Sequence, residues 1–273
     1  MNRIDEVFNK LKQENKKALI PFISNGDPSL DETVQAVLEL EKNGASIVEL
    51  GIPFSDPLAD GPVIQESYIR ALKNGIKVKD VFECAKRVRK TSQIPLVIMV
   101  YYNLVFHYGV ERFLEDSGKA GIDGLIVPDI PLEERGQLKD ICEKNGVYLI
   151  PLVAPTSHER IAKITNGAKG FVYCVSSNGT TGERSSLSSN IDEYLNAVKS
   201  NANVPICLGF GISSRKVVSD VKDYCDGVIV GSAVVRRLAE DREEAFEFVS
   251  GLREELDKWF WIKMNYNPNN YME

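Results

Sequence analysis

The chain has 273 residues, 43% of them hydrophobic, which is enough for a large core in one or two domains. A net charge of −6 gives no electrostatic reason to expect nucleic acid or an anionic membrane as partner. Five scattered cysteines without a CxxC pair argue against a disulfide framework, and no signal peptide or long apolar stretch is apparent, so we expect a soluble cytoplasmic protein.

The N-terminal segment MNRIDEVFNKLKQENKK is amphipathic and predicts a helix ahead of the first strand. Eight short apolar runs follow. They are rich in Val, Ile and Leu and do not alternate strictly with polar residues, which is typical of parallel strands covered on both faces. The predicted strands are 18–24, 46–51, 95–101, 123–128, 147–153, 170–176, 204–210 and 226–231.

Segments of helical period separate these strands, for example residues 30–43 and 131–145, and each of these two ends at a glycine. Eight such units in about 250 residues predict a (β/α)₈ TIM barrel rather than an open doubly wound sheet. The only dinucleotide-like signal is the G-x-G of GFGIS, which is weak. We expect a single barrel domain over residues 1–262 and a frayed C-terminal tail over 263–273.

An acidic residue interrupts the second predicted strand. Glu49 has the same strand parity as Ile47, so both side chains point to the same face of the sheet. If that face is the barrel interior, burial raises the pKa of Glu49 toward neutrality and suits it to acid–base chemistry. The alternative is a structural glutamate paired with a lysine or arginine.

Two aspartates follow this strand in the loop that leads to the next helix. Asp60 stands before Gly61 and Pro62, where a helix is predicted to begin, so it is either a second functional carboxylate or a turn or cap residue. For Asp56, which precedes Pro57, we favour the turn or cap interpretation.

Glycine-rich loops follow the last three predicted strands, at 176–186, 209–214 and 231–235. In a barrel of this kind the loops after strands seven and eight often bind phosphate through backbone N–H groups. The composition of the loop after strand six is typical of a mobile lid, or otherwise of an ordinary surface loop.

Apolar residues also stand near the strand ends. They are either core or the lining of a pocket for a flat aromatic group: Phe22, Met99, Ile126, Leu152 and Tyr173. The two histidines belong to no metal-binding motif, so we expect no metal site. Carboxylate acid–base chemistry on a phosphorylated, aromatic substrate remains.

Several segments together resemble the tryptophan synthase alpha chain family over residues 1 to 255. The most specific is ELGIPFSDPLADGPVIQ (49–65), and the others are PFISNGDPS (21–29), YYNLVFHYG (101–109), VPDIPLEE (127–134), TGERSS (181–186), GFGIS (209–213) and VGSA (230–233). The resemblance implies a (β/α)₈ barrel that cleaves indole-3-glycerol phosphate into indole and glyceraldehyde 3-phosphate.

The resemblance also implies roles for individual positions. Glu49 and Asp60 fall on the catalytic acids. The remaining positions fall on the substrate pocket, the phosphate cradle and the lid: Phe22, Met99, Tyr173, Thr181, Gly182, Phe210, Gly211, Gly231 and Ser232.

The family works with a beta chain that holds pyridoxal phosphate, so the resemblance implies an α₂β₂ complex and no cofactor in this chain. Loops 53–61, 101–109 and 128–133 match the surface that faces the partner.

Three other functions stay open at this point. The first is a sugar-phosphate isomerase or epimerase, whose pocket should be polar rather than aromatic. The second is a non-catalytic regulatory subunit of a beta-type partner, which would not need both Glu49 and Asp60. The third is a free-standing lyase that releases indole.

Overall fold

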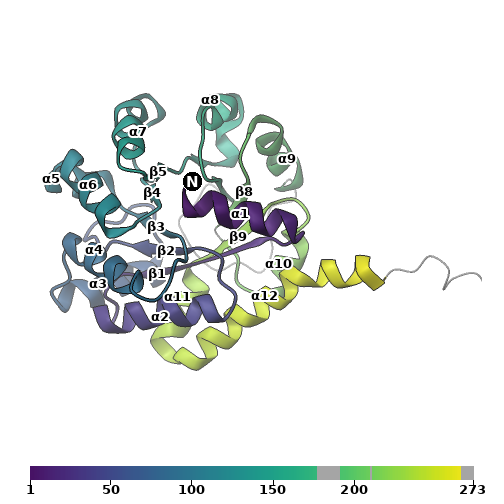
Figure 1. Ribbon diagram of the computed structural model, residues 1–273, viewed down its shortest axis with the longest axis horizontal. Helices are drawn as coiled ribbons and strands as arrows, with labels where there is room; N and C mark the ends of the chain where they lie inside the picture. The colour runs from purple at the N-terminus through teal and green to yellow at the C-terminus, as the bar shows by residue number, and fades with distance from the viewer. Residues whose placement is uncertain (177–190, 210, 266–273) are drawn as a thin grey trace, which may run out of the picture.

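The computed structural model describes residues 1–176, 191–209 and 211–265. Within these ranges one parallel sheet runs in the order β5-β4-β3-β2-β1-β9-β8-β7-β6 (Figure 1). Its strands are β1 (Ala18–Ser24), β2 (Val48–Gly51), β3 (Leu96–Met99), β4 (Gly124–Ile126), β5 (Tyr148–Leu149), β6 (Leu152–Val153), β7 (Val172–Val175), β8 (Ile206–Gly209) and β9 (Gly227–Val230).

The fifth predicted strand, 147–153, is divided into β5 and β6 by Ile150 and Pro151. The first piece pairs with β4 and the second with β7. The residues between them bridge both neighbours, because the Ile150 amide donates to Leu125 and the Pro151 carbonyl accepts from the Tyr173 amide. The two pieces thus occupy one strand position and close the sheet into the predicted barrel. Each of the other seven predicted strands contains an observed one.

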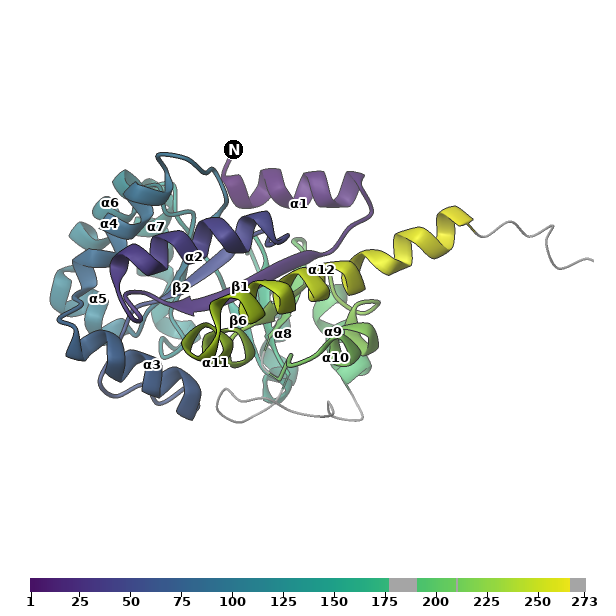
Figure 2. The same cartoon turned by 90° about the horizontal axis from the view of Figure 1, so that it is seen from below.

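Helices surround the sheet (Figures 1 and 2). They are α1 (Arg3–Gln13), α2 (Leu30–Lys42), α3 (Pro62–Lys73), α4 (Val78–Val88), α5 (Tyr102–Tyr108), α6 (Val110–Ala120), α7 (Arg135–Lys144), α8 (Ile161–Thr165), α9 (Ile191–Asn201), α10 (Arg215–Val221), α11 (Ser232–Glu240) and α12 (Arg242–Asn265), with 3₁₀ turns η1 (Leu132–Glu134) and η2 (Pro155–Arg160). In the described part of the chain, none of these helices has the length and apolar composition needed to cross a bilayer.

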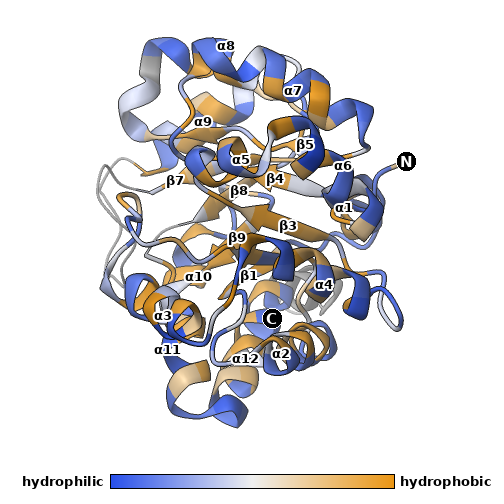
Figure 3. Ribbon diagram, turned by 90° about the vertical axis from the view of Figure 1, so that its left-hand side faces the viewer, coloured by the Kyte–Doolittle hydropathy of each residue, from blue (hydrophilic) through white to orange (hydrophobic). Residues whose placement is uncertain are grey.

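Strand parity divides the apolar residues into two cores. On β1, Leu19 and Ile23 belong to the layer between sheet and helices, whereas Ile20 and Phe22 belong to the barrel interior. Figure 3 shows the resulting pattern, with hydrophobic strands at the centre and helices that carry hydrophilic residues on the outside.

The predicted N-terminal helix α1 covers the N-terminal end of the barrel. Ile4 and Phe8 are buried in the interior core. Gly124 and Gly170 leave room for Ile4, since a Cβ at either glycine would lie 3.2 Å from its side chain. Phe8 packs on Phe171 with ring centroids 5.9 Å apart. Because this end is filled, the opposite end, where the strands terminate, is the place for a site.

Candidate active site

Glu49 points into the barrel, on the same face of the sheet as Ile47, which is the first of the two possibilities left open by strand parity. Ile47 belongs to the interior core, and Glu49 stands in register with Phe22 on β1 and Val97 on β3. These residues form one layer of the barrel interior, near the C-terminal ends of the strands.

The Glu49 carboxyl group is buried without a counter-ion. Its side chain is 1% exposed, and no ion pair or hydrogen bond to its Oε1 atom occurs among the described residues. Burial raises the pKa of Glu49 to about 8, and the negative charge of Asp60 adds to this effect. The structural ion-pair interpretation therefore does not describe this residue. Near pH 7 the group is mostly protonated and available as an acid.

Asp60 lies in the loop between β2 and α3 and is 2% exposed. Tyr101 donates its hydroxyl hydrogen to Asp60 Oδ2 over 2.7 Å. The N-cap of α3 is Gly61, so the Asp60 carboxylate does not act as the cap of this helix. Burial raises its pKa to about 6, and the Tyr101 hydrogen bond opposes that rise. Near pH 7 Asp60 is mostly ionised.

The two carboxyl groups thus have opposite protonation states near neutral pH, although both are buried. Such a difference is a common feature of acid–base sites. Asp56 takes no part in this pair, because its side chain is exposed and accepts a hydrogen bond from its neighbour Ser55. This agrees with its interpretation as a turn residue.

The apolar wall of the site is built around two strand glycines. A Cβ at Gly51 would lie 2.4 Å from the ring of Phe22, and one at Gly209 would lie 2.5 Å from the ring of Tyr173. The glycines therefore let these rings lie flat against the strands. The residues predicted to line a pocket at the strand ends all belong to the interior cluster or, in the case of Leu152, pack against it: Phe22, Met99, Ile126, Leu152 and Tyr173.

Two backbone features resemble an anion cradle at the ends of β8 and β9, which are hydrogen-bonded neighbours. Gly211 has a φ of +82°, which favours glycine, and Gly231 precedes the first residue of α11, Ser232. The amides of Val234 and Val235 bond back to the Gly231 carbonyl, and the amides before them, at the start of α11, have no acceptor within a helix and are the type that binds anions. Thr181, Gly182 and Phe210 lie outside the described residues, as does most of the predicted lid.

Sequence reasoning missed two hydroxyl groups at this site. Tyr101 binds Asp60, and its parity with the inward Met99 was a usable signal. Tyr68 on α3 is fully buried in the interior core. Its spacing of four residues from Ile64 places both on one helix face, a pattern that is visible only once the start of α3 is known.

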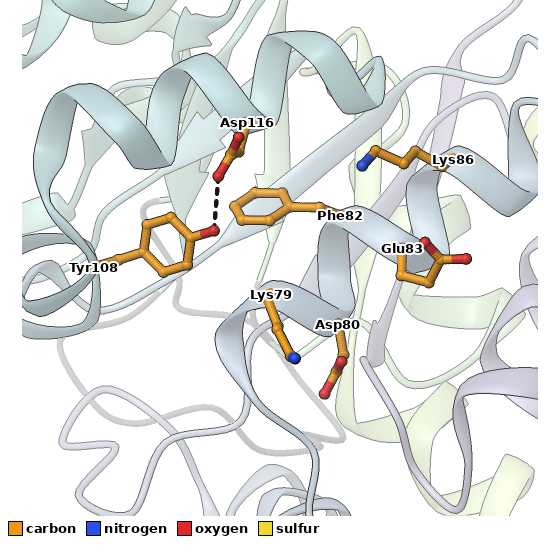
Figure 4. A pocket seen from close by; sticks show the side chains of 7 residues that line it. All are labelled: Lys79, Asp80, Phe82, Glu83, Lys86, Tyr108 and Asp116. Atoms are coloured by element: carbon orange, nitrogen blue, oxygen red, sulfur yellow. Dashed lines mark hydrogen bonds between the residues drawn. The ribbon is translucent and has the colours of Figure 1, made fainter.

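A hollow of about 340 Å³ lies outside the barrel between α4 and the α5–α6 pair (Figure 4). Among the lining residues shown in Figure 4, the Tyr108 hydroxyl donates a hydrogen bond to Asp116 over 2.7 Å. Two lysines and two acids of α4 line it, Lys79, Asp80, Glu83 and Lys86, and such a mixture is typical of a solvated helix face. Within the described ranges, no group of three or more His, Cys, Asp or Glu side chains could hold a metal ion.

A closed (β/α)₈ barrel with two buried carboxyl groups at its mouth and glycine turns after its last strands defines a barrel enzyme for acid–base chemistry on an anionic substrate.

Comparison with known proteins identifies the family. Residues 8–259 match the model of the tryptophan synthase alpha chain. The tryptophan synthase alpha chain of Clostridium beijerinckii is 62% identical over 257 residues, which cover 94% of this chain and all of the relative. That of Caldanaerobacter subterraneus subsp. tengcongensis is 55% identical, with 94% and 100% covered. A crystal structure of the alpha subunit from Legionella pneumophila is similar with a TM-score of 0.87, 36% identity and coverage of 94% and 99%.

The chain belongs to the tryptophan synthase alpha chain family. It is a carbon–carbon lyase that cleaves indole-3-glycerol phosphate to indole and glyceraldehyde 3-phosphate.

Proposed function

We propose that Glu49 and Asp60 carry the cleavage of indole-3-glycerol phosphate in this chain. The bond to be broken joins C3 of the indole ring to the glycerol carbon that bears a hydroxyl group. An aromatic carbon is a poor leaving group, so C3 must first be protonated. The reaction then needs a base for the hydroxyl proton and negative charge near the ring nitrogen.

Glu49 meets the first two demands in succession. Its protonated carboxyl group gives its hydrogen to C3, which leaves a cationic indolenine and a carboxylate. The carboxylate then takes the hydroxyl proton, the C3–carbon bond breaks, and its electron pair returns to the ring. The hydroxyl oxygen becomes the aldehyde oxygen of the product, and Glu49 is protonated again. The raised pKa of about 8 supports this double role.

Asp60 meets the third demand. Its pKa of about 6 leaves it negatively charged at neutral pH, and the Tyr101 hydroxyl holds one of its oxygens. An anion fixed in a buried site stabilises positive charge on the ring far more than it would in water.

The rest of the pocket orients the substrate. We assign the ring to the apolar wall with Phe22, Met99, Tyr173 and Phe210. We assign the phosphate to the backbone around Gly182, Gly211, Gly231 and Ser232, with Thr181 on the lid. Holding both ends makes the proton transfers effectively intramolecular.

We further propose that the chain binds a beta chain in an α₂β₂ complex in the cytoplasm. Pyridoxal phosphate belongs to that partner, because the cleavage here needs only an acid, a base and an anion.

Two exposed apolar residues support the proposed surface for the partner: Leu58 is 89% exposed and Phe106 is 63% exposed. Leu58 lies in the loop after β2 and Phe106 on α5, and the two segments are joined, since the Ala59 amide donates to the hydroxyl of Tyr101 at the start of α5 over 3.0 Å. We keep residues 1–262 as one domain and 263–273 as its tail.

The buried, unpaired Glu49 carboxyl group is the observation on which the proposal rests. The purified chain is mixed with indole-3-glycerol phosphate, and indole is measured with and without a beta chain. Glu49→Gln should lower the rate by at least about 100-fold, since one acid–base group contributes about 10² to 10⁴. Glu66→Gln, on the exposed face of α3, is the control and should keep full activity. A Glu49→Gln rate within about tenfold of wild type would reject the proposal.

A further inference from the structure

Two oxygen atoms in the barrel interior lack hydrogen-bond partners among the described residues. One is Oε1 of Glu49, and the other is the hydroxyl oxygen of Tyr68. Tyr68 comes from helix α3, is 0% exposed and belongs to the same interior cluster as Phe22 and Met99. Buried hydroxyl groups are normally hydrogen-bonded, so an unpaired one calls for an explanation.

Gly51 shows where the Tyr68 hydroxyl lies. Gly51 follows Glu49 by two residues on β2, so a Cβ there would point to the same face, about 7 Å further toward the mouth. That Cβ would lie 2.6 Å from the Tyr68 hydroxyl oxygen and 2.4 Å from Phe22. The hydroxyl group therefore faces the barrel interior directly above Glu49, beside the ring that lines the pocket.

The hydroxyl group keeps its proton under all working conditions. Burial raises the pKa of Tyr68 well above its usual value, and the neighbouring acidic groups, Asp60 above all, raise it further. Tyr68 is thus a hydrogen-bond donor that does not itself titrate in the catalytic range.

We propose that Tyr68 is a further catalytic residue, whose hydroxyl donates a hydrogen bond to the substrate oxygen that Glu49 deprotonates. This inference rests on the proposed role of Glu49. The substrate hydroxyl donates its hydrogen to the Glu49 carboxylate and accepts one from Tyr68, so both unpaired atoms gain a partner. As the proton leaves, negative charge grows on that oxygen before the carbonyl group forms. The Tyr68 proton stays on Tyr68 and only stabilises this charge.

Packing alone does not account for the hydroxyl group. Phenylalanine would fill the same volume without a buried, unpaired oxygen, and such an oxygen destabilises the fold. The tyrosine at this place is explained if its hydroxyl acts on a bound molecule.

Tyr68→Phe separates the two interpretations because it removes only the oxygen. We expect kcat to fall between about tenfold and about 10³-fold, the range of a lost oxyanion donor, with KM within about threefold. The thermal midpoint should not fall. Tyr148→Phe is the matched control: it loses a 2.7 Å hydrogen bond to Asp5 at the opposite end of the barrel and should keep its kcat.

Binding of indole-3-propanol phosphate supplies a second readout, because this analogue lacks the glycerol hydroxyl groups. Its Kd should be the same for Tyr68→Phe and wild type. A kcat within twofold of wild type, or a Kd for the analogue weakened by more than about threefold, would overturn the inference and leave Tyr68 a packing residue. If Glu49→Gln also stayed active, the proposed function itself would fail; an inactive Glu49→Gln beside an unaffected Tyr68→Phe rejects only the inference.

Discussion

Tyr101 donates a hydrogen bond of 2.7 Å to Asp60 while its hydroxyl oxygen accepts one of 3.0 Å from the Ala59 amide. The tyrosine lies between β3 and α5 and the aspartate in the loop after β2, so the bond joins the segments that follow two neighbouring strands. It also favours the ionised form of Asp60, which is the form that the proposed role of Asp60 requires.

Tyr101→Phe tests this relationship through the pH dependence of kcat/KM. The acid limb reports deprotonation of Asp60, and the basic limb reports loss of the proton from Glu49. The hydrogen bond lowers the pKa of Asp60, so its removal should move the acid limb to higher pH and leave the basic limb nearly in place. An acid limb that stays where it is, or moves to lower pH, would contradict the assignment.

Glu49→Gln should change the pH dependence of stability. The folded-state pKa of about 8 lies above the ordinary 4.5, so folding favours the protonated form. This contribution is complete below pH 4.5 and is lost as the pH rises toward 8. Glutamine does not titrate, so between pH 5 and pH 9 the free energy of unfolding of wild type should fall relative to that of the variant, by at most about 4 kcal/mol. Urea unfolding at both pH values measures this, with Glu66→Gln as control; a difference independent of pH would refute it.

Gly51→Ala should damage the site and the fold together. The added methyl group would meet Phe22 at 2.4 Å and the Tyr68 hydroxyl at 2.6 Å. Such overpacking destabilises by about 1–3 kcal/mol, and displacement of both aromatic rings should lower kcat/KM. Gly136→Ala is the control, because a Cβ there meets no atom within 4 Å and should leave activity unchanged. Equal stability and activity of the two variants would contradict the prediction, because it would show that the barrel interior accommodates the methyl group without cost.

Leu58→Asp should weaken binding of a tryptophan synthase beta chain. The residue is 89% exposed in a loop assigned to the partner surface, and a charge at the centre of an apolar contact is unfavourable. We expect Kd, measured by calorimetry, to rise at least about tenfold. Ile69→Asp replaces an apolar residue that is 50% exposed on α3, outside that surface, and should bind normally. An equal effect of both substitutions would place the interface elsewhere.

Much of the fold could be predicted from sequence because buried parallel strands have a simple signature. The first strand, 18–24, was predicted with its observed bounds, and strand parity put Glu49 on the same face as Ile47, which the structure shows to be the barrel interior. The division of strand five was not predicted. Pro151 has no N–H group, but its effect depends on how the neighbouring strands curve around it.

Site residues could be predicted from the sequence where a motif or the alternation of side chains along a strand identified them. They could not be predicted where their role depends on contacts between segments far apart in the chain. Asp60 could be either a cap or a functional group until Tyr101, 41 positions away, was seen to bind it. From the sequence alone, Tyr68 cannot be distinguished from an ordinary core residue of a helix. Its hydroxyl group reaches the barrel interior because Gly51 has no side chain, and no local sequence pattern reveals this contact.

Near neutral pH, Glu49 should be protonated and Asp60 ionised in the same buried site. Carbon-13 NMR of the side-chain carboxyl groups, assigned with Glu49→Gln and Asp60→Asn, measures both titrations directly in the substrate-free chain. Glu49 should titrate near pH 8 and Asp60 near pH 6. Titration of both groups below about pH 5, as in solvent-exposed carboxyl groups, would contradict the account.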